Sequence, residues 1–96
     1  MVIMGFMMII LMIIFIKYNN MENQILEILK GIRPENDFSK SVNFIEEGFL
    51  DSFDIVSLVN ELEQNFSIVI DGIEIIPENF ASIESIKALI DRSEKF

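Results

Sequence analysis

The 96-residue sequence contains no cysteine and no histidine. The lack of cysteine excludes disulfides, thiolate metal sites and thiol nucleophiles. The lack of histidine removes the side chain that most often serves as a general base or transition-metal ligand near neutral pH. Most familiar arrangements of catalytic residues are therefore excluded, and the sequence predicts neither a catalytic centre nor a metal site.

Basic residues are scarce as well. Seven Lys and Arg stand against 16 Asp and Glu, which gives a formal net charge of −9. No basic residue occurs between Lys40 and Lys87, a stretch that contains ten acidic residues. Such a surface would repel a phosphate backbone, so we expect no nucleic-acid partner. The length of the chain predicts one small domain.

Charge is almost absent from the first twenty residues, where Lys17 is the only charged side chain. Residues 1–16 are apolar apart from Gly5, whereas residues 21–96 have an ordinary soluble composition. As a helix, sixteen residues span about 24 Å, which is less than the hydrocarbon core of a bilayer, about 30 Å thick. Snorkelling by Lys17 and an interfacial Tyr18 would reduce that difference.

Two interpretations of residues 1–20 stay open. In the first, the segment is a membrane anchor, and the positive-inside tendency places the domain of residues 21–96 on the cytoplasmic side. In the second, Met21 is the true start and the leader is a translated upstream stretch, because five of the six methionines lie at or before Met12. Both interpretations place a domain boundary between residues 20 and 21.

From residue 21 onward, hydrophobic periodicity predicts an all-α fold, a small acidic bundle of three main helices and one short helix. The first helix is expected over residues 20–32, with Asn20 as its cap. The second is expected over residues 52–65, after an N-cap at Asp51. The apolar side chains that form its buried stripe, at helical spacing, are Ile55, Leu58, Val59, Leu62 and Phe66.

The connections between these helices are also informative. Residues 33–50 are rich in large apolar side chains, so much of this segment should pack on the core. We expect residues 67–76 to form an extended loop rather than a hairpin around Asp71 and Gly72, because an isolated two-stranded hairpin is only marginally stable. A short helical turn is expected from Pro77, and a last helix after a cap at Ser82.

Ser52 is predicted to lie in the exposed first turn of the second helix. A phosphate ester on this side chain would lie close to unpaired backbone amides and to the positive end of the helix dipole. No Lys or His lies nearby in the sequence to activate the hydroxyl, so Ser52 is a poor nucleophile and a better acceptor of a modification. Taken alone, an Asp-Ser pair at a helix start most often serves only to cap the helix.

The surroundings of Ser52 resemble the acyl and peptidyl carrier protein family. In that family an Asp-Ser-Leu type motif opens the second helix of a small acidic four-helix bundle. The resemblance extends from about residue 21 to residue 90. The matching positions are Gly48, Leu50, Asp51, Ser52, Phe53 in the place of Leu, Asp54, Val56, Leu58, Val59, Leu62, Glu63 and Phe66.

The resemblance implies a 4′-phosphopantetheine arm, which a phosphopantetheinyl transferase attaches to Ser52 from coenzyme A. The thiol of the arm would hold an acyl or aminoacyl group as a thioester. A loading ligase would supply the group and other enzymes would use it, so the chain would not itself be an enzyme. The resemblance also implies a cytoplasmic location. The carboxylates expected to dock on basic patches of these partners are Asp51, Asp54, Glu61 and Glu63.

Two features favour a stand-alone specialised carrier, such as the D-alanyl type, over a carrier of fatty-acid synthesis. Ser57 and Gln64 stand where the fatty-acid carriers usually have acids, and the connection from Phe66 to Pro77 is longer than theirs. The competing hypothesis is an acidic helical adaptor, tethered to a membrane or not, in which Ser52 bears no prosthetic group. Attachment of the arm to Ser52 distinguishes the two hypotheses.

Overall fold

The structure is a computed structural model that describes the backbone of residues 2–96 and the side chains of residues 7–13 and 20–96. Within these residues three α-helices form the framework of the domain, and they are α1 (Val2–Ile32), α2 (Ser52–Phe66) and α3 (Ile83–Arg92). The shorter elements are the 3₁₀ turns η1 (Phe38–Lys40), η2 (Gly72–Glu74) and η3 (Pro77–Phe80) and the strands β1 (Ile68–Val69) and β2 (Glu94–Lys95). The prediction of a small helical bundle is confirmed.

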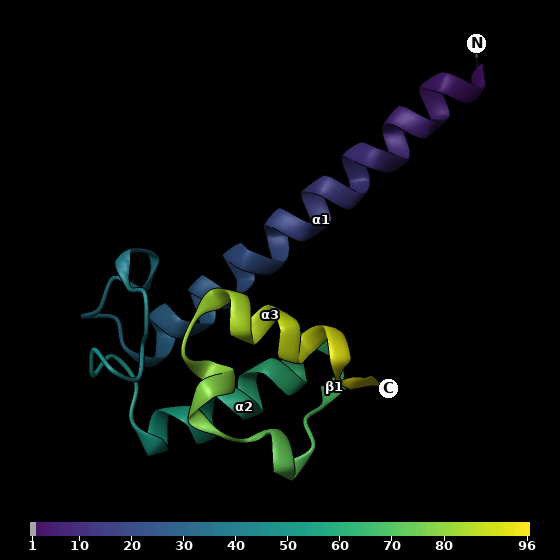
Figure 1. Cartoon of the computed structure of the whole chain (residues 1–96). Helices are drawn as coiled ribbons and strands as arrows, with labels where there is room; N and C mark the ends of the chain where they lie inside the picture. Colours follow the sequence, from purple (N-terminus) through teal and green to yellow (C-terminus); the bar gives the residue numbers. More distant parts are fainter. Residues whose placement is uncertain (1) are drawn as a thin grey trace.

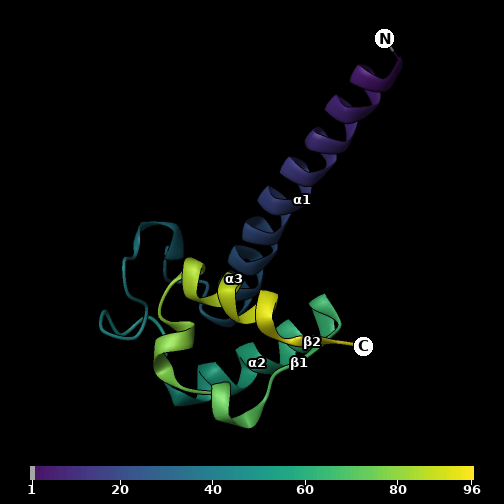
Figure 2. The same cartoon turned by 45° about the vertical axis from the view of Figure 1, so that its right-hand side comes forward.

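Helix α1 differs most from the prediction. A start at Asn20 is wrong, because α1 is continuous from Val2 and Asn20 lies in its interior. No proline or glycine interrupts the chain between Gly5 and Gly31, so nothing stops the helical hydrogen bonds from propagating through this stretch. The 31 residues of α1 extend over about 46 Å. Figure 1 and Figure 2 show the N-terminal half of α1 projecting away from the other elements.

The projecting half of α1 exposes apolar side chains. Of the side chains described over residues 7–13, Ile10 is half-buried and the other six are each at least 54% exposed, and these are Met7, Met8, Ile9, Leu11, Met12 and Ile13. Met1 and the other side chains of the leader, including those of Lys17 and Tyr18, lie outside the described residues. Within the described part of the chain, no helix combines the length and apolarity needed to cross a bilayer, so the transmembrane helix considered from the sequence is not supported.

The hydrophobic core lies between the C-terminal half of α1, α2 and α3. Each helix contributes side chains at helical spacing that are almost completely buried, and these are Ile25 and Leu29 of α1, Leu58 and Leu62 of α2, and Ile86, Leu89 and Ile90 of α3. The inward face predicted for the second helix is thus confirmed. A buried ion pair also joins α3 to α1, since the ammonium of Lys87 lies 3.0 Å from the carboxylate of Glu22.

Residues 33–50 pack on the core as expected. Phe38, Phe44 and Leu50 are buried, and the Phe38 ring meets Phe44 and Phe49 edge to face at centroid distances of 5.0 and 5.5 Å. Val42 is the exception, with 85% of its surface exposed. Because aromatic contacts hold this connection on the core, its end is fixed where the chain enters α2.

The segment after α2 forms a loop without a hairpin, as predicted. Ser67 ends α2 in the left-handed conformation, with φ of 52°. The β-branched residues that follow pair instead with the end of the chain, where Ile68 lies opposite Lys95 in an antiparallel register. Pro77 then opens η3, and the hydroxyl of Ser82 accepts the backbone N–H of Ser85 at the start of α3, as predicted.

Candidate functional site

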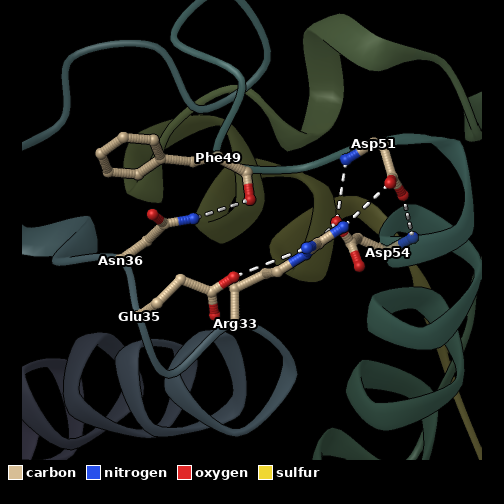
Figure 3. Close-up of polar contacts among 6 residues, drawn as sticks. All are labelled: Arg33, Glu35, Asn36, Phe49, Asp51 and Asp54. Atoms are coloured by element: carbon tan, nitrogen blue, oxygen red, sulfur yellow. Dashed lines mark hydrogen bonds and ion pairs between the residues drawn. The ribbon is translucent and has the colours of Figure 1, made fainter.

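Ser52 is the first residue of α2, and its side chain is exposed. Immediately before it, the Asp51 carboxylate accepts the Asp54 backbone N–H at 3.0 Å, and the Asp54 carboxylate accepts the Asp51 N–H at 2.9 Å (Figure 3). This reciprocal capping box satisfies backbone amides of the first turn. The hydroxyl of Ser52 makes no hydrogen bond with any side chain or backbone group that the structure describes. It is therefore available to react.

The chain that leads into Ser52 is firmly held. Gly48 has φ of 74°, a left-handed conformation that residues with a side chain rarely adopt. The backbone carbonyl of Phe44 then accepts the N–H groups of Phe49 and Leu50 at 2.8 and 3.2 Å. Leu50 is 3% exposed. A buried leucine two residues before an exposed serine fixes the position of the hydroxyl relative to the core.

Arg33 contacts both carboxylates of the capping box, and no sequence pattern singled it out. Its Nε lies 2.7 Å from Oδ2 of Asp54, and its Nη2 lies 2.9 Å from Oδ2 of Asp51 (Figure 3). Its Nη1 is 3.5 Å from the carboxylate of Glu35. Arg33 directly follows α1, so these contacts join the end of α1 to the start of α2. The sequence does show a basic residue, Arg33, just after the first helix and two acids three positions apart, Asp51 and Asp54. It does not show that they meet, because Arg33 and Asp51 are 18 positions apart.

These contacts favour the charged forms of both partners. The pKa of the Asp51 carboxyl is lowered, chiefly because it accepts the Asp54 backbone amide, and the charge of Arg33 adds to the effect. The pKa of the Arg33 guanidinium is raised, chiefly by its hydrogen bond to Asp54 and then by the charge of that residue. Desolvation opposes both shifts. Asp51 and Arg33 are therefore a charged pair at neutral pH.

The four carboxylates expected to dock on partners do not form one uncompensated acidic face. Asp54 is only 8% exposed and is paired with Arg33. Glu63 is half-buried, and its carboxylate accepts the backbone N–H of Ile70 at 3.0 Å. Glu61 is exposed and lines a groove between α1 and α2. Since residues two apart on a helix point to different sides, Glu61 and Glu63 do not share a face.

The surface of α2 beside Ser52 is apolar instead. Phe53 is 84% exposed and Val56 is 68% exposed, although both are large hydrophobic residues. Of the exposed residues that follow in α2, Glu61 is acidic and the others carry no charge, and these are Ser57, Asn60, Gln64 and Asn65. Among the described residues, no group of three or more carboxylates is placed to hold a metal ion.

Comparison with known proteins identifies the family. The family model described as a phosphopantetheine attachment site matches residues 23–92, which contain the capping box and Ser52. The chain belongs to the phosphopantetheine-binding carrier proteins. It is thus a carrier whose cofactor is a covalently attached 4′-phosphopantetheine, and it is not itself an enzyme. The partners of such carriers are, in general, a phosphopantetheinyl transferase and acyl-using enzymes.

Two curated relatives of this carrier come from Bradyrhizobium diazoefficiens (strain USDA 110). Aminoacyl carrier protein 1 is 32% identical over 75 residues, which cover 74% of this chain and 82% of the relative. Aminoacyl carrier protein 2 is 28% identical over 75 residues, which cover 74% of this chain and 83% of the relative. No solved structure matches the carrier significantly. The carrier identification made from the motif around Ser52 is confirmed at the level of the family.

Proposed function

We propose that the hydroxyl of Ser52 is the attachment point of the arm. The observation that carries this proposal is that the Ser52 hydroxyl has no hydrogen-bond partner among the described residues, although the backbone on which it stands is firmly held. Five other serines have hydroxyls engaged in hydrogen bonds within the described residues, and they are Ser39, Ser41, Ser82, Ser85 and Ser93. Ser57 lies inside α2 and Ser67 at its C-terminal end. Ser52 alone stands at the N-terminal end of α2, where a phosphate ester is favoured by the helix dipole.

The surroundings of Ser52 are suited to an attached arm. Once attached, the arm supplies the thiol that holds the cargo, a group that this chain lacks because it contains no cysteine. The capping box and the buried Leu50 hold the start of α2, while Phe53 offers apolar surface beside the point of attachment. The chain's own residues thus fix the base of the arm and leave its far end to the partner enzymes.

The cargo that we propose is an aminoacyl group, delivered by a dedicated ligase in the cytoplasm. Both relatives described above are named aminoacyl carrier proteins. The outward side of α2 is also neutral at Ser57 and Gln64, where carriers of fatty-acid synthesis usually have acids. The docking surface of this proposal is the exposed side of α2 around Ser52. Of the four predicted docking acids, only Asp51 and Glu61 are exposed there.

Intact-mass spectrometry tests the attachment. The full chain is incubated with coenzyme A, Mg²⁺ and a broad-specificity phosphopantetheinyl transferase. We expect a mass increase of one phosphopantetheine group per chain, with peptide mapping that places it on residue 52. A chain that stays unmodified with several transferases, each active on a reference carrier in the same tube, would contradict the proposal and favour the adaptor hypothesis.

We also propose that residues 21–96 are the complete carrier unit and that the apolar leader contacts lipid. The family match begins at residue 23, and Met21 is the first of the described side chains that packs on the core. Six of the seven apolar side chains of residues 7–13 are exposed, and Ile10 alone is half-buried, an arrangement that is favourable only against an apolar partner. Burial of such side chains in acyl chains supplies about 25 cal/mol for each Å² removed from water.

Vesicle flotation tests the role of the leader. The full chain should float with phosphatidylglycerol and phosphatidylcholine vesicles, whereas a chain that begins at Met21 should stay at the bottom and still accept the arm. Ile9→Asp should weaken flotation strongly, because a charge at apolar depth costs about 2.5–3.5 kcal/mol. The matched control is Ile73→Asp, at a position 81% exposed on η2, which should float like the full chain. The proposal is wrong if the full chain does not float or if the shorter chain lacks helical circular dichroism.

A further inference from the structure

The carboxylate of Asp51 is exposed, but both of its oxygens are already engaged. Oδ1 accepts the Asp54 backbone N–H at 3.0 Å, and Oδ2 accepts Nη2 of Arg33 at 2.9 Å. The carboxylate of Asp54 is less accessible still, because its side chain is 11% exposed and its Oδ2 receives both Nε of Arg33 and the Asp51 N–H. Each oxygen of Asp51 therefore already accepts one donor, and Arg33 compensates the negative charge that a partner's cationic side chain would meet.

Arg33 is the cation that occupies this position, and its geometry is specific. Figure 3 shows the guanidinium extending from the segment after α1 into the space between the two carboxylates at the start of α2. It engages two different acids through two different nitrogens, at 2.7 and 2.9 Å. A planar guanidinium can make both contacts at once, whereas a lysine ammonium offers a single point charge. The pairing is therefore a built contact between two elements and not a chance surface ion pair.

We propose that Arg33 is a specificity-determining residue that masks Asp51 from the enzymes that approach Ser52. Docking then depends on the apolar surface of Phe53 and Val56, and partners that would recognise a bare acidic helix start are disfavoured. This inference rests on the proposed function, in which Ser52 receives the arm. Arg33 acts through Asp51 and is thus a positioning residue, not a group that touches the reacting atoms.

The charge of the approaching enzyme makes the masking measurable. Coenzyme A carries phosphate groups, so an enzyme that binds it presents cations near the entrance to its active site. Unmasking Asp51 adds one unpaired negative charge at the point of approach. At contact distance in water, one unit charge changes an association constant by about fourfold. Salt removes the effect, since the Debye length falls from about 10 Å at 0.1 M to about 3 Å at 1 M.

The experiment compares transfer of the arm to the full wild-type chain and to Arg33→Gln with the same transferase. We expect Arg33→Gln to raise kcat/KM about fourfold in about 50 mM NaCl and to lose that gain in about 500 mM NaCl. The change should lie in KM and not in kcat. Arg33→Lys keeps the charge and should restore the wild-type salt dependence. The matched control is Lys40→Gln, which removes the same charge from an exposed lysine 3.9 Å from its nearest carboxylate, Asp37, and should change kcat/KM less than twofold.

A second variant tests the masking from the side of Asp51. Asp51→Asn keeps a good N-cap. In the Arg33→Gln background it should abolish the gain, because the double variant restores the net charge of the wild-type site. Circular dichroism at the assay temperature establishes that each variant is folded. If Arg33→Gln does not fold, Arg33→Met takes its place, and a folded Arg33→Met that reacts no faster than Lys40→Gln overturns the inference.

The failures of the two proposals are distinguishable. A wild-type chain that accepts no arm refutes the proposed function. A wild-type chain that accepts the arm refutes the masking role if folded Arg33→Gln reacts no faster than Lys40→Gln at low salt. A slower reaction of folded Arg33→Gln refutes it too, because Arg33 would then aid docking instead of masking Asp51.

Discussion

Replacing Ser52 by alanine is expected to abolish attachment of the arm while the domain stays folded. The loss should be complete, because the arm is joined through the hydroxyl oxygen that the substitution removes. Intact-mass spectrometry after incubation with coenzyme A, Mg²⁺ and a transferase measures it directly. Stability should change by less than about 0.5 kcal/mol, since Ser52 is exposed and its hydroxyl makes no hydrogen bond within the described residues.

The matched control for this substitution is Ser57→Ala. Ser57 is also an exposed serine of α2, but it lies five residues further along the helix, away from the capping box. Ser57→Ala should accept one arm as the wild-type chain does. Two results would contradict the assignment, namely a mass increase in Ser52→Ala or the absence of one in folded Ser57→Ala. Melting curves of both variants exclude the trivial explanation that one of them has unfolded.

Helix α2 shows how much of the site could be predicted from local sequence. An acidic cap at Asp51 and an apolar stripe at helical spacing predict where the helix begins and which face it buries, and the structure confirms both. The exposure of Ser52 was expected from its place in the first turn of the helix, and the structure confirms it. These features depend on contacts between residues three or four apart, which a single sequence displays.

The environment of Asp54 could not be predicted in this way. Its position outside the apolar stripe suggested an exposed docking acid, but Asp54 is buried and pairs with Arg33, which directly follows α1. That contact joins residues 21 positions apart, across a connection whose course the sequence does not specify. Whether a charged residue faces solvent or a cation therefore depended on tertiary packing.

The helix start expected at Asn20 is wrong for a different reason. A sharp change in composition separates the leader from the domain, yet the backbone of α1 continues through it without a break. The backbone hydrogen bonds of a helix form with apolar and charged side chains alike. A proline, a glycine or a competing cap ends the helix. The change in composition thus lies next to Met21, the first of the described side chains that packs on the core, and not at the start of the helix.

Leu62→Ala is expected to lower the free energy of unfolding by about 2–5 kcal/mol, the cost of removing a fully buried leucine and leaving a cavity. Leu62 is 0% exposed and belongs to the core shared by the three helices. A domain of this size commonly has only about 5 kcal/mol to lose. Urea unfolding followed by circular dichroism should show a midpoint about 2 M or more lower, with an m-value near the usual 1 kcal/mol/M.

Val56→Ala, on the opposite side of the same helix, is the matched control for Leu62→Ala. Val56 is 68% exposed, so its truncation should change stability by less than about 0.5 kcal/mol. A near-neutral Leu62→Ala beside a costly Val56→Ala would mean that the buried face of α2 is wrongly assigned.

The two alanine variants of Leu62 and Ser52 should also separate stability from function. Because Leu62 does not reach the surface, folded Leu62→Ala should accept the arm at the wild-type kcat/KM, whereas Ser52→Ala should be as stable as the wild type and accept none.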